Sequence, residues 1–371
     1  MTARSLVPPY IAALAPYQPG KPIEVLRREL GGAWPAEGAV KLASNENPLG
    51  ASSAARAAMA DVDISRYPDA GSYALREKLA QRLSVDVDQV LIGSGSNELI
   101  NLAVQTFCGP GDEILTPELQ FICYELAAQA FDRPLRRSPN RDGFAIDVDA
   151  LIAAVTPRTK LVFLATPNNP TGAHIGRAEI MRLVRELPED VVLVLDEAYA
   201  EYADEQDRTE PRELLMARDR LVLLRTFSKI HGLAGLRVGY AIAAAKLCDL
   251  MNRPRLPFNV TNVGHAAAIA AIDDEEHIAR SRSLNAAGRS HLTRELSSRG
   301  FVVSPSQGNF VLVEVPAGLT AGALFDALQR RGVIVRPLAP YRMPQHLRIS
   351  VGLEDENARL IEALDKILDS K

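Results

Sequence analysis

Residues Arg225 to Tyr240 read RTFSKIHGLAGLRVGY, and this run decides how the rest of the chain is interpreted. The amine of Lys229 follows the hydroxyls of Thr226 and Ser228, and Arg237 lies eight residues further on. The glycines between the lysine and the arginine let the backbone bend sharply and come close to a bound anion. An amine, two hydroxyls and a guanidinium in this order favour a site for an aldehyde cofactor that carries a phosphate.

Pyridoxal phosphate is a cofactor of this kind. Its aldehyde forms an imine with a lysine amine, and hydroxyls and an arginine suit its phosphate. A lone Ser-Lys pair after a hydrophobic strand is more often part of a solvated loop, so the hypothesis depends on further residues.

A carboxylate follows an aliphatic run at Asp196, which ends the strand-like residues 191–195 (VVLVL). Held against a pyridine nitrogen, it would keep that nitrogen protonated and make the ring an electron sink. Tyr199 lies three residues later, and Asn168 lies in the turn-like residues 165–172 (ATPNNPTG). Both could donate hydrogen bonds to the phenolic oxygen of the cofactor. The alternatives are a helix-capping aspartate and an ordinary turn.

Residues 93–98 (GSGSNE) connect a short strand to a helix that we expect from Glu98 onward. The backbone amides of Ser96 and Asn97 would then lie at the positive end of the helix, where a phosphate binds well. Phe121 opens the next predicted helix and could stack on the cofactor ring. Taken alone, these features are more typical of an ordinary loop and of a core aromatic residue.

Between about residues 89 and 243, short β-rich runs alternate with amphipathic segments of helix length. Strands that are apolar throughout and joined by helical crossovers favour a mainly parallel sheet covered on both faces. Ligands bind at the carboxyl ends of such strands, so the polar residues after the apolar runs should converge on one crevice. The predicted strands are 90–93, 113–115, 160–165, 191–195, 221–225 and 238–243, and the predicted helices are 98–107, 121–131 and 177–187.

The character of the sequence changes after residues 255–259 (RLPFN), where long, charged helical periodicity begins. Short strand-like or helix-like segments follow at 310–313, 322–330 and 347–351. This pattern predicts a smaller α+β domain that the N-terminal residues complete. We therefore expect a large cofactor-binding domain at 46–257, and a small domain with an N-terminal arm formed by 1–45 and 258–371.

The composition is that of a soluble globular protein of 371 residues, with 47% hydrophobic and 24% charged residues. A formal net charge of −4 gives no basic surface for nucleic acid or an anionic membrane. Cys108, Cys123 and Cys248 are too scattered for a disulfide framework, and the six histidines have no metal-ligand spacing. We expect no metal, no membrane span, no export signal and a cytoplasmic location.

Nearly the whole chain resembles fold-type I, aspartate-aminotransferase-like pyridoxal phosphate enzymes, and more narrowly the histidinol-phosphate aminotransferase family. The run around Lys229 and the spacing of Asn168, Asp196 and Tyr199 carry the wider resemblance. Residues 16–21 (PYQPGK) and 42–50 (LASNENPLG) are more specific to the narrower family, and the resemblance continues through 66–69 (RYPD) to 347–352 (LRISVG). It implies an α/β fold with a mainly parallel, seven-stranded sheet covered by helices, plus a smaller α+β domain.

The resemblance also implies roles for single residues. Lys229 would be the Schiff-base lysine and Asp196 the partner of the ring nitrogen, with Tyr199 and Asn168 at the phenolic oxygen and Phe121 over the ring. Ser96, Asn97, Thr226, Ser228 and Arg237 would surround the phosphate. Tyr67 would reach the cofactor of a second subunit, which makes a homodimer with shared active sites. The residues that match substrate positions are Tyr17, Asn45, Arg336 and Arg348.

Three departures from the family pattern limit the resemblance, and the third bears on the substrate. Ile230 and His231 follow the lysine where a small residue and tyrosine are common, and Asn97 stands where aspartate frequently precedes the glutamate. Arg342, in residues 340–344 (PYRMP), replaces a glycine of the usual Gly-Tyr-Gly-Leu-Pro. This arginine adds a charge near the expected substrate arginines and leaves the identity of the amino donor open.

The resemblance implies transfer of the amino group of L-histidinol phosphate to 2-oxoglutarate, which gives imidazole acetol phosphate and L-glutamate in histidine biosynthesis. An aromatic amino-acid aminotransferase acting on phenylalanine is the alternative on the same scaffold. A phosphothreonine-type decarboxylase would need no oxo acid. A non-enzymatic module that senses pyridoxal phosphate would need a DNA-binding domain or basic arm, and the sequence contains neither.

Overall fold

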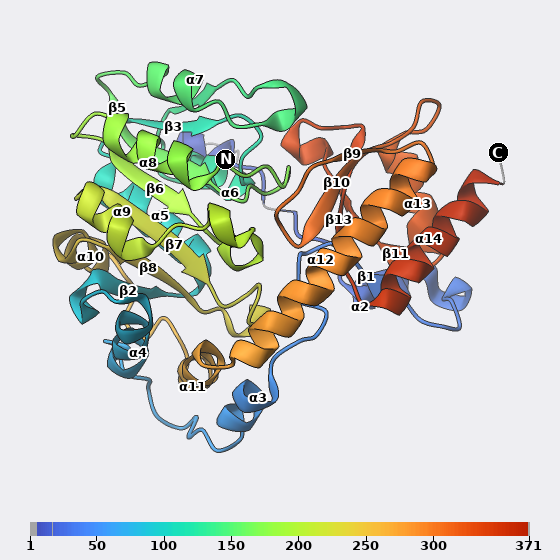
Figure 1. Ribbon diagram of the computed structural model, residues 1–371, viewed down its shortest axis with the longest axis horizontal. Helices are drawn as coiled ribbons and strands as arrows, with labels where there is room; N and C mark the ends of the chain where they lie inside the picture. Colours follow the sequence, from blue (N-terminus) through green and yellow to red (C-terminus); the bar gives the residue numbers. More distant parts are fainter. Residues whose placement is uncertain (1–5, 17, 370–371) are drawn as a thin grey trace.

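The computed structural model describes residues 6–16 and 18–369, and its centre is a seven-stranded sheet (Figure 1). Six strands run in one direction, and β8 lies antiparallel to both of its neighbours. The mainly parallel sheet predicted from the sequence is confirmed. The strand order is β2 (Val90–Gly93), β8 (Gly239–Ala243), β7 (Leu221–Thr226), β6 (Val192–Asp196), β5 (Thr159–Ala165), β3 (Glu113–Pro117) and β4 (Leu135–Ser138).

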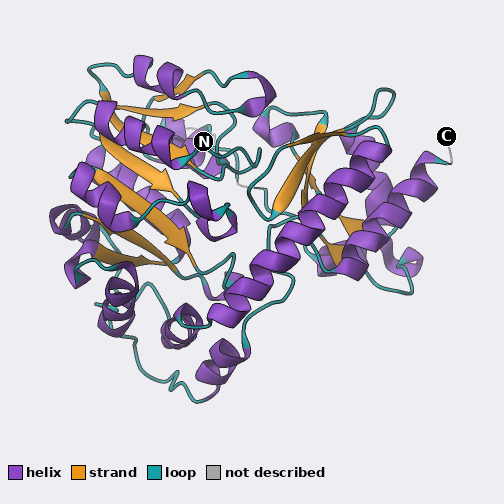
Figure 2. Cartoon of the chain, viewed as in Figure 1, coloured by secondary structure: helices purple, strands orange, loops and turns teal. Residues whose placement is uncertain are grey.

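Helices cover both faces of this sheet, which explains why its central strands are apolar throughout (Figure 2). Along β6, Leu193 and Leu195 pack against one helical layer, whereas Val192 and Val194 pack against the other. The first layer contains α3 (Ser53–Ala60), α4 (Tyr73–Leu83), α7 (Val148–Ala153), α8 (Arg177–Glu186), α9 (Pro211–Ala217) and α11 (Asn262–Ile272). The second contains α5 (Gly95–Phe107), α6 (Ile122–Ala130) and α10 (Ala245–Asn252).

A smaller α+β unit lies beside the large sheet (Figure 1). Its antiparallel sheet has the order β12 (Arg336–Pro337), β13 (His346–Ser350), β10 (Phe310–Glu314) and β9 (Val302–Ser304). Near the N-terminus, β1 (Val40–Lys41) pairs in parallel with β11 (Val333–Ile334), so the N-terminal residues complete this unit. The remaining helices are α1 (Pro9–Ala12), α2 (Ile23–Leu30), α12 (Glu275–Ser298), α13 (Ala321–Arg330) and α14 (Glu354–Leu368), and the short 3₁₀ helices are 31–33, 87–89, 142–144, 200–202, 205–207, 234–236 and 339–341.

The long helix α12 connects the two units. Near its start, Ile278 packs with Tyr199 and Ile230 of the large unit, and near its end Leu292 and Leu296 enter the core of the small unit. Helix α11 belongs by packing to the large sheet, because Ala267 and Ala271 lie in that core. The predicted boundary at 45/46 stays a prediction. For the second boundary, at 257/258, this packing leads us to propose a position after α11 instead.

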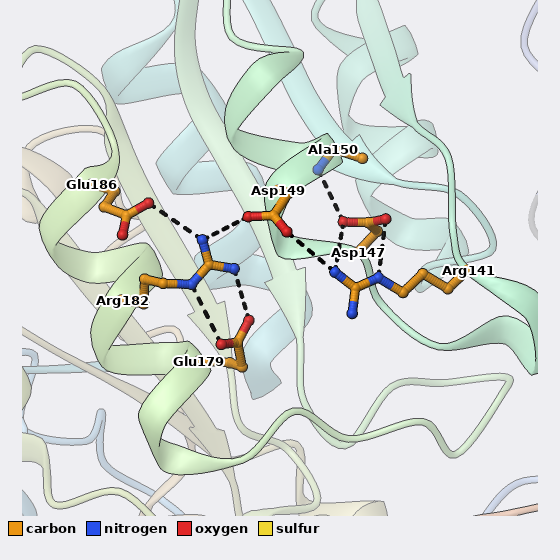
Figure 3. A network of polar contacts seen from close by, with 7 residues as sticks. All are labelled: Arg141, Asp147, Asp149, Ala150, Glu179, Arg182 and Glu186. Atoms are coloured by element: carbon orange, nitrogen blue, oxygen red, sulfur yellow. Dashed lines mark hydrogen bonds and ion pairs between the residues drawn. The ribbon is translucent and has the colours of Figure 1, made fainter.

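Exposed ion pairs connect α7 to α8 on the outer surface (Figure 3). Arg182 of α8 pairs with Asp149 of α7 at 2.7 Å, and Arg141 pairs with Asp147 at 3.1 Å. Asp147 also caps α7 by accepting a hydrogen bond from the amide of Ala150. Such exposed pairs contribute little to stability individually. Among the described helices, none is both long and apolar enough to cross a membrane.

Candidate active site

A cavity of about 190 Å³ lies where strands β5, β6 and β7 end, between the large sheet and the small unit. The polar residues that follow the apolar runs therefore do converge on one crevice. Its lining comprises Gly20, Ala43, Ser44, Asn45, Ser96, Asn97, Phe121, Ala165, Pro167, Asn169, Asp196, Ala198, Tyr199, Thr226, Ser228, Lys229, Arg237, Arg336 and Arg348.

Lys229 enters the cavity from the loop after β7. Its Nζ atom donates a hydrogen bond to the carbonyl of Ser44 at 3.3 Å and lies 5.5 Å from the centre of the Tyr199 ring. Burial lowers the pKa of Lys229 to about 7, and the positive charge of Arg348 acts in the same direction. At neutral pH a large fraction of this amine is uncharged, the state in which it can act as a nucleophile or accept a proton.

Asp196 is the last residue of β6, and its carboxylate is buried in the same cavity. Tyr124 donates its hydroxyl hydrogen to Oδ2 at 2.8 Å, and the amide of Ala198 donates to Oδ1 at 3.1 Å. Burial raises the pKa of Asp196 to about 6, while the two hydrogen bonds oppose this rise. The carboxylate is therefore mostly charged at neutral pH and can stabilise a protonated ring nitrogen.

Tyr199 is held by a chain of hydrogen bonds from the N-terminal segment. Asn45 donates its side-chain Nδ2 hydrogen to the Tyr199 hydroxyl oxygen at 2.9 Å. Ser350 of β13 fixes Asn45 in turn, because its hydroxyl accepts from the Asn45 amide and donates to Oδ1. Since the Tyr199 oxygen already accepts a hydrogen bond, its own hydrogen can point to a ligand. Asn45, expected to bind substrate, thus positions Tyr199 from the wall of the cavity.

The other end of the cavity is a cradle for an anion at the start of α5. Gly95 has φ +73°, and a Cβ atom there would lie 2.6 Å from Nη2 of Arg237. A Cβ atom on Gly239 of β8 would lie 2.6 Å from the amide nitrogen of Ser96. Only glycine at both positions lets the guanidinium and the helix start approach this closely. Ser96 and Asn97 line the cavity at the positive end of α5, as predicted.

Two hydroxyls and an aromatic ring complete this end. Thr226 donates to the carbonyl of Val238 at 3.3 Å and accepts from the Ser228 amide at 3.1 Å. The Ser228 hydroxyl accepts a hydrogen bond from Arg237 at 3.4 Å. Phe121 caps the start of α6 and also faces the cavity. These predicted residues lie together with Lys229 around one space.

The amide side chain at the cavity belongs to Asn169 and not to Asn168, which corrects the sequence-based expectation. Asn168 is fully buried, and its Nδ2 atom donates to the Leu119 carbonyl at 2.9 Å and to the Thr171 hydroxyl at 2.8 Å. Its amide is therefore used to hold the turn. Asn169 lines the cavity and accepts a hydrogen bond from Arg348.

Arg336 and Arg348 bring two guanidinium groups to the cavity. They are directly opposite each other on the antiparallel strands β12 and β13, so their side chains lie on the same face. Arg348 donates to the Ala43 carbonyl at 2.7 Å, and its buried Nε has no hydrogen-bond partner within the described residues. Arg336 donates to the Gln18 carbonyl at 2.5 Å. Tyr17, the other predicted anion contact, lies outside the described residues.

The departures from the family pattern lie outside the cavity lining, apart from Asn97. Arg342 is exposed and pairs with Glu125 at 3.8 Å. Ile230 is fully buried, and its carbonyl accepts a hydrogen bond from Asn47. His231 packs against the Phe227 ring, and burial lowers its pKa to about 4, so this histidine is neutral at physiological pH.

Tyr67 is the predicted cofactor residue that does not face the cavity of its own chain. Its side chain is 82% exposed and stacks on Phe258 with 4.6 Å between ring centres. An exposed aromatic pair is available for contact with another molecule, so this position agrees with the predicted reach into a second subunit without testing it.

Three residues of the site escaped the sequence-based prediction. Tyr124 is the hydrogen-bond partner of Asp196, Asn169 faces the cavity, and Ser44 supplies the carbonyl that contacts Lys229. Tyr124 lies three residues after Phe121, in the first turn of α6, and this spacing gives no signal for its contact with Asp196. The sequence does not indicate which of the neighbouring residues Asn168 and Asn169 points its amide into the cavity. It also gives no signal for the contact made by Ser44, because that contact uses a backbone carbonyl.

This combination of lysine, carboxylate, tyrosine and anion cradle on a mainly parallel sheet is that of the pyridoxal phosphate-dependent transferases. The chain belongs to the class I and II aminotransferase family, whose family model matches residues 37–364. It is therefore an aminotransferase that uses pyridoxal phosphate.

Within this family the chain is similar to histidinol-phosphate aminotransferases. It is 47% identical to that of Anaeromyxobacter sp. over 98% of this chain and 99% of the relative. It is 46% identical to that of Methylobacillus flagellatus over 98% of each chain. The crystal structure of the Sinorhizobium meliloti histidinol-phosphate aminotransferase in complex with pyridoxal-5'-phosphate superposes with a TM-score of 0.88, at 28% identity over 100% of this chain and 99% of that one.

The residues present fit pyridoxal phosphate. The cradle between Gly95 and Arg237 has the chemistry for the phosphate, and the amine of Lys229 suits the aldehyde. Asp196 retains a mostly charged carboxylate for the ring nitrogen, although it is buried. The hydroxyl hydrogen of Tyr199 remains for the phenolic oxygen.

Proposed function

We propose that this aminotransferase transfers the amino group of L-histidinol phosphate to 2-oxoglutarate, yielding imidazole acetol phosphate and L-glutamate in histidine biosynthesis. The observation that carries the proposal is the pair Arg336 and Arg348, opposite each other on β12 and β13 at the cavity. The similarity to histidinol-phosphate aminotransferases over nearly the whole chain supports the choice of donor.

The polar and aromatic residues named at the cavity divide the tasks of this reaction. When bound, pyridoxal phosphate supplies an aldehyde that takes up the donor's amino group and a ring that withdraws electrons from its α carbon. Asp196 would hold the ring nitrogen protonated, and Tyr199 and Asn169 would be the donors for the phenolic oxygen. Ser96, Asn97, Thr226, Ser228 and Arg237 would bind the phosphate, and Phe121 would cover the ring.

Lys229 moves the proton of the reaction. Its Nζ atom must be uncharged to take the hydrogen from the α carbon of the donor, and its pKa of about 7 makes this state accessible at neutral pH. With the cofactor bound, the same Nζ atom would also be the group that gives this proton up again. A surface lysine would be almost fully charged under these conditions and would be a poor base.

The two arginines explain how one site can accept two different anions. Histidinol phosphate carries a phosphate and no carboxylate on its α carbon, whereas 2-oxoglutarate carries two carboxylates. The forked donors of an arginine suit both groups. Arg348 is the shared anchor, because its contact with Asn169 and its unsatisfied Nε lie in the buried part of the site. Arg336 and Tyr17 are supporting phosphate contacts.

A panel of amino donors with 2-oxoglutarate, monitored by glutamate formation, tests the proposal. Histidinol phosphate should have the highest kcat/KM, and Arg348→Ala should impair both half-reactions. Arg342→Gly restores the usual family residue outside the cavity and should leave the preference unchanged. A higher kcat/KM for phenylalanine would establish the aromatic alternative, and release of carbon dioxide without an oxo acid would establish a decarboxylase.

We also propose that two copies of the chain form a homodimer with shared active sites. Exposed apolar side chains lie in the segment before α4, at the first residue of α4 and in the segment before α11, and we call them the aromatic patch: Ile64, Tyr67, Tyr73, Leu256 and Phe258. A symmetric dimer would cover this patch and bring Tyr67 to the phosphate of the other subunit's cofactor. We further propose a cytoplasmic location, in line with the three free cysteines.

A further inference from the structure

We propose that Tyr124 is a positioning residue whose hydroxyl keeps the Asp196 carboxylate charged and correctly oriented for the cofactor ring. This inference rests on the proposed function only in that Asp196 faces the ring nitrogen. The contact itself is present without any ligand, since Tyr124 Oη donates to Asp196 Oδ2 at 2.8 Å.

The packing around Tyr124 fixes the direction of this hydrogen bond. Tyr124 lies in the first turn of α6 and is 1% exposed. Its ring stacks on Phe163 of β5 with 4.6 Å between centres and an angle of 9°, and Phe121 contacts it edge-on at 5.8 Å. Because Phe163 packs on the face of the Tyr124 ring and Phe121 contacts it edge-on, the ring can rotate little, and its hydroxyl stays directed at Asp196.

The electrostatic surroundings make this hydroxyl important. Glu197 and burial both favour the neutral form of the Asp196 carboxyl, whereas Lys229, the Ala198 amide and the Tyr124 hydroxyl favour the charged form. The other titratable neighbours, Cys123 and Tyr199, have pKa values raised by burial and are uncharged. Tyr124 therefore supplies the one side-chain hydrogen bond that stabilises the negative charge among the described residues.

The hydroxyl matters most before the cofactor is bound. A carboxyl that holds its own proton must release it before it can pair with a protonated ring nitrogen, so cofactor binding would weaken as the pH falls. Because burial already places the pKa of Asp196 at about 6, a further rise would carry it into the physiological range. Tyr124 prevents this without occupying any space in the cavity.

The first test is the titration of Asp196 in cofactor-free protein. Tyr124→Phe keeps the ring stacked on Phe163 and removes only the hydroxyl. We would label the aspartate carboxyl carbons with ¹³C, assign Asp196 through the Asp196→Asn variant, and follow the signal from pH 4 to 9. The midpoint should move to higher pH in Tyr124→Phe. It should stay in place in Tyr202→Phe, which removes the hydroxyl of another buried tyrosine, 6% exposed. An unchanged midpoint in Tyr124→Phe would overturn the proposal.

The second test is the dissociation constant of pyridoxal phosphate, measured by absorbance at pH 6 and pH 8. Tyr124→Phe should weaken binding about tenfold or more at pH 6. The loss should be clearly smaller at pH 8, where the Asp196 carboxyl is charged in the variant as well as in the unchanged protein. A purely structural defect would weaken binding equally at the two pH values.

If Tyr124→Phe does not fold, 3-fluorotyrosine can be placed at position 124 instead. Its hydroxyl donates a stronger hydrogen bond, so the titration midpoint of Asp196 should move to lower pH. Neither test uses an amino donor, so a wrong substrate assignment leaves both outcomes intact.

Discussion

Lys229 and Asp196 are two ionisable groups in one cavity, and burial moves their pKa values toward each other. The pKa of the lysine falls to about 7 and that of the aspartate rises to about 6, because charge is costly inside the protein. The site therefore holds a base that is ready at neutral pH and a carboxylate that is still charged. Burying these two ionisable groups costs free energy, which the rest of the fold has to offset. Lys229 and Asp196 therefore reduce the stability of the cofactor-free protein.

Replacing Lys229 by methionine should stabilise the cofactor-free protein in a pH-dependent manner. The folded pKa of about 7 lies below the unfolded value of 10.5, so below pH 7 the buried charge is fully present and opposes folding. Above pH 7 the folded lysine loses its proton, and the free energy of unfolding of the unchanged protein rises by up to ~1.4 kcal/mol per pH unit. The advantage of Lys229→Met should shrink from pH 7 to pH 9 in urea unfolding. A constant difference would show that Lys229 is not a buried, perturbed amine. Turnover should be lost throughout.

The two neighbouring asparagines should respond oppositely to substitution. Asn169→Ala removes a cavity amide and the acceptor of Arg348, so kcat/KM should fall ~10-fold or more with little loss of stability. Asn168→Ala leaves the partly buried Leu119 carbonyl without its donor and should cost ~1–3 kcal/mol of unfolding free energy. Steady-state kinetics and urea unfolding of both variants check this. The reverse result would restore Asn168 as the cofactor residue.

At the level of elements, the anion cradle depends on the contact between the start of α5 and the strand β8. The antiparallel strand β8 lies between β2 and β7, and its first residue, Gly239, faces the first turn of α5. This contact brings Arg237, which lies just before β8, to the positive end of the helix. The helix end and the arginine then act on the same anion, which neither would bind as well alone.

Gly95→Ala should disrupt this cradle. The added Cβ atom would lie 2.6 Å from Nη2 of Arg237 at a backbone φ of +73°. We expect the dissociation constant of pyridoxal phosphate to rise ~10-fold or more, because the guanidinium must move away from the phosphate. Gly111→Ala is the matched control, since its φ is +87° and nothing lies within 4 Å of the added atom. Equal losses of affinity in both variants would mean that backbone strain alone is responsible.

At the level of the whole molecule, the active site requires both units of the chain. Lys229, Asp196 and Arg237 come from the large unit, whereas Arg336 and Arg348 come from the sheet of the small unit. The proposed cofactor residues and the proposed substrate residues therefore belong to different units, and any movement of the small unit changes the position of the two arginines relative to Lys229. In the proposed homodimer, the aromatic patch of a second copy of the chain would contribute Tyr67 to each site.

Mixing two defective variants tests the shared site. Tyr67→Ala chains keep Lys229, and Lys229→Ala chains keep Tyr67, so a mixed dimer contains one complete site. After unfolding and refolding together, the mixture should recover up to about a quarter of the activity of the unchanged dimer. Met216→Ala, which removes an 80% exposed side chain on α9, should instead leave activity unchanged on its own. A monomeric mass in an active sample, or no recovery in the mixture, would contradict the shared site.

Much of the fold followed from hydrophobic patterns. The central strands were predicted because runs such as 191–195 and 221–225 are apolar on both faces, which requires helices on both sides. The edge strand β4 was not predicted, since its sequence LRRS contains two charged residues and lacks the apolar pattern of the central strands. The antiparallel direction of β8 also has no local signal, because an apolar run does not indicate whether its strand lies parallel or antiparallel to its neighbours.

The sequence alone determined the chemistry of the site: an amine at Lys229, a carboxylate after an aliphatic strand at Asp196, and a phosphate cradle of glycines, hydroxyls and Arg237. These are properties of residue type and of spacing along one segment. Only the tertiary structure decided that Asn169 faces the cavity, that Tyr124 supports Asp196, and that Arg342 pairs with Glu125 at the surface. Such contacts join residues that are close in space and distant in sequence, so they depend on how the layers pack and not on any local pattern.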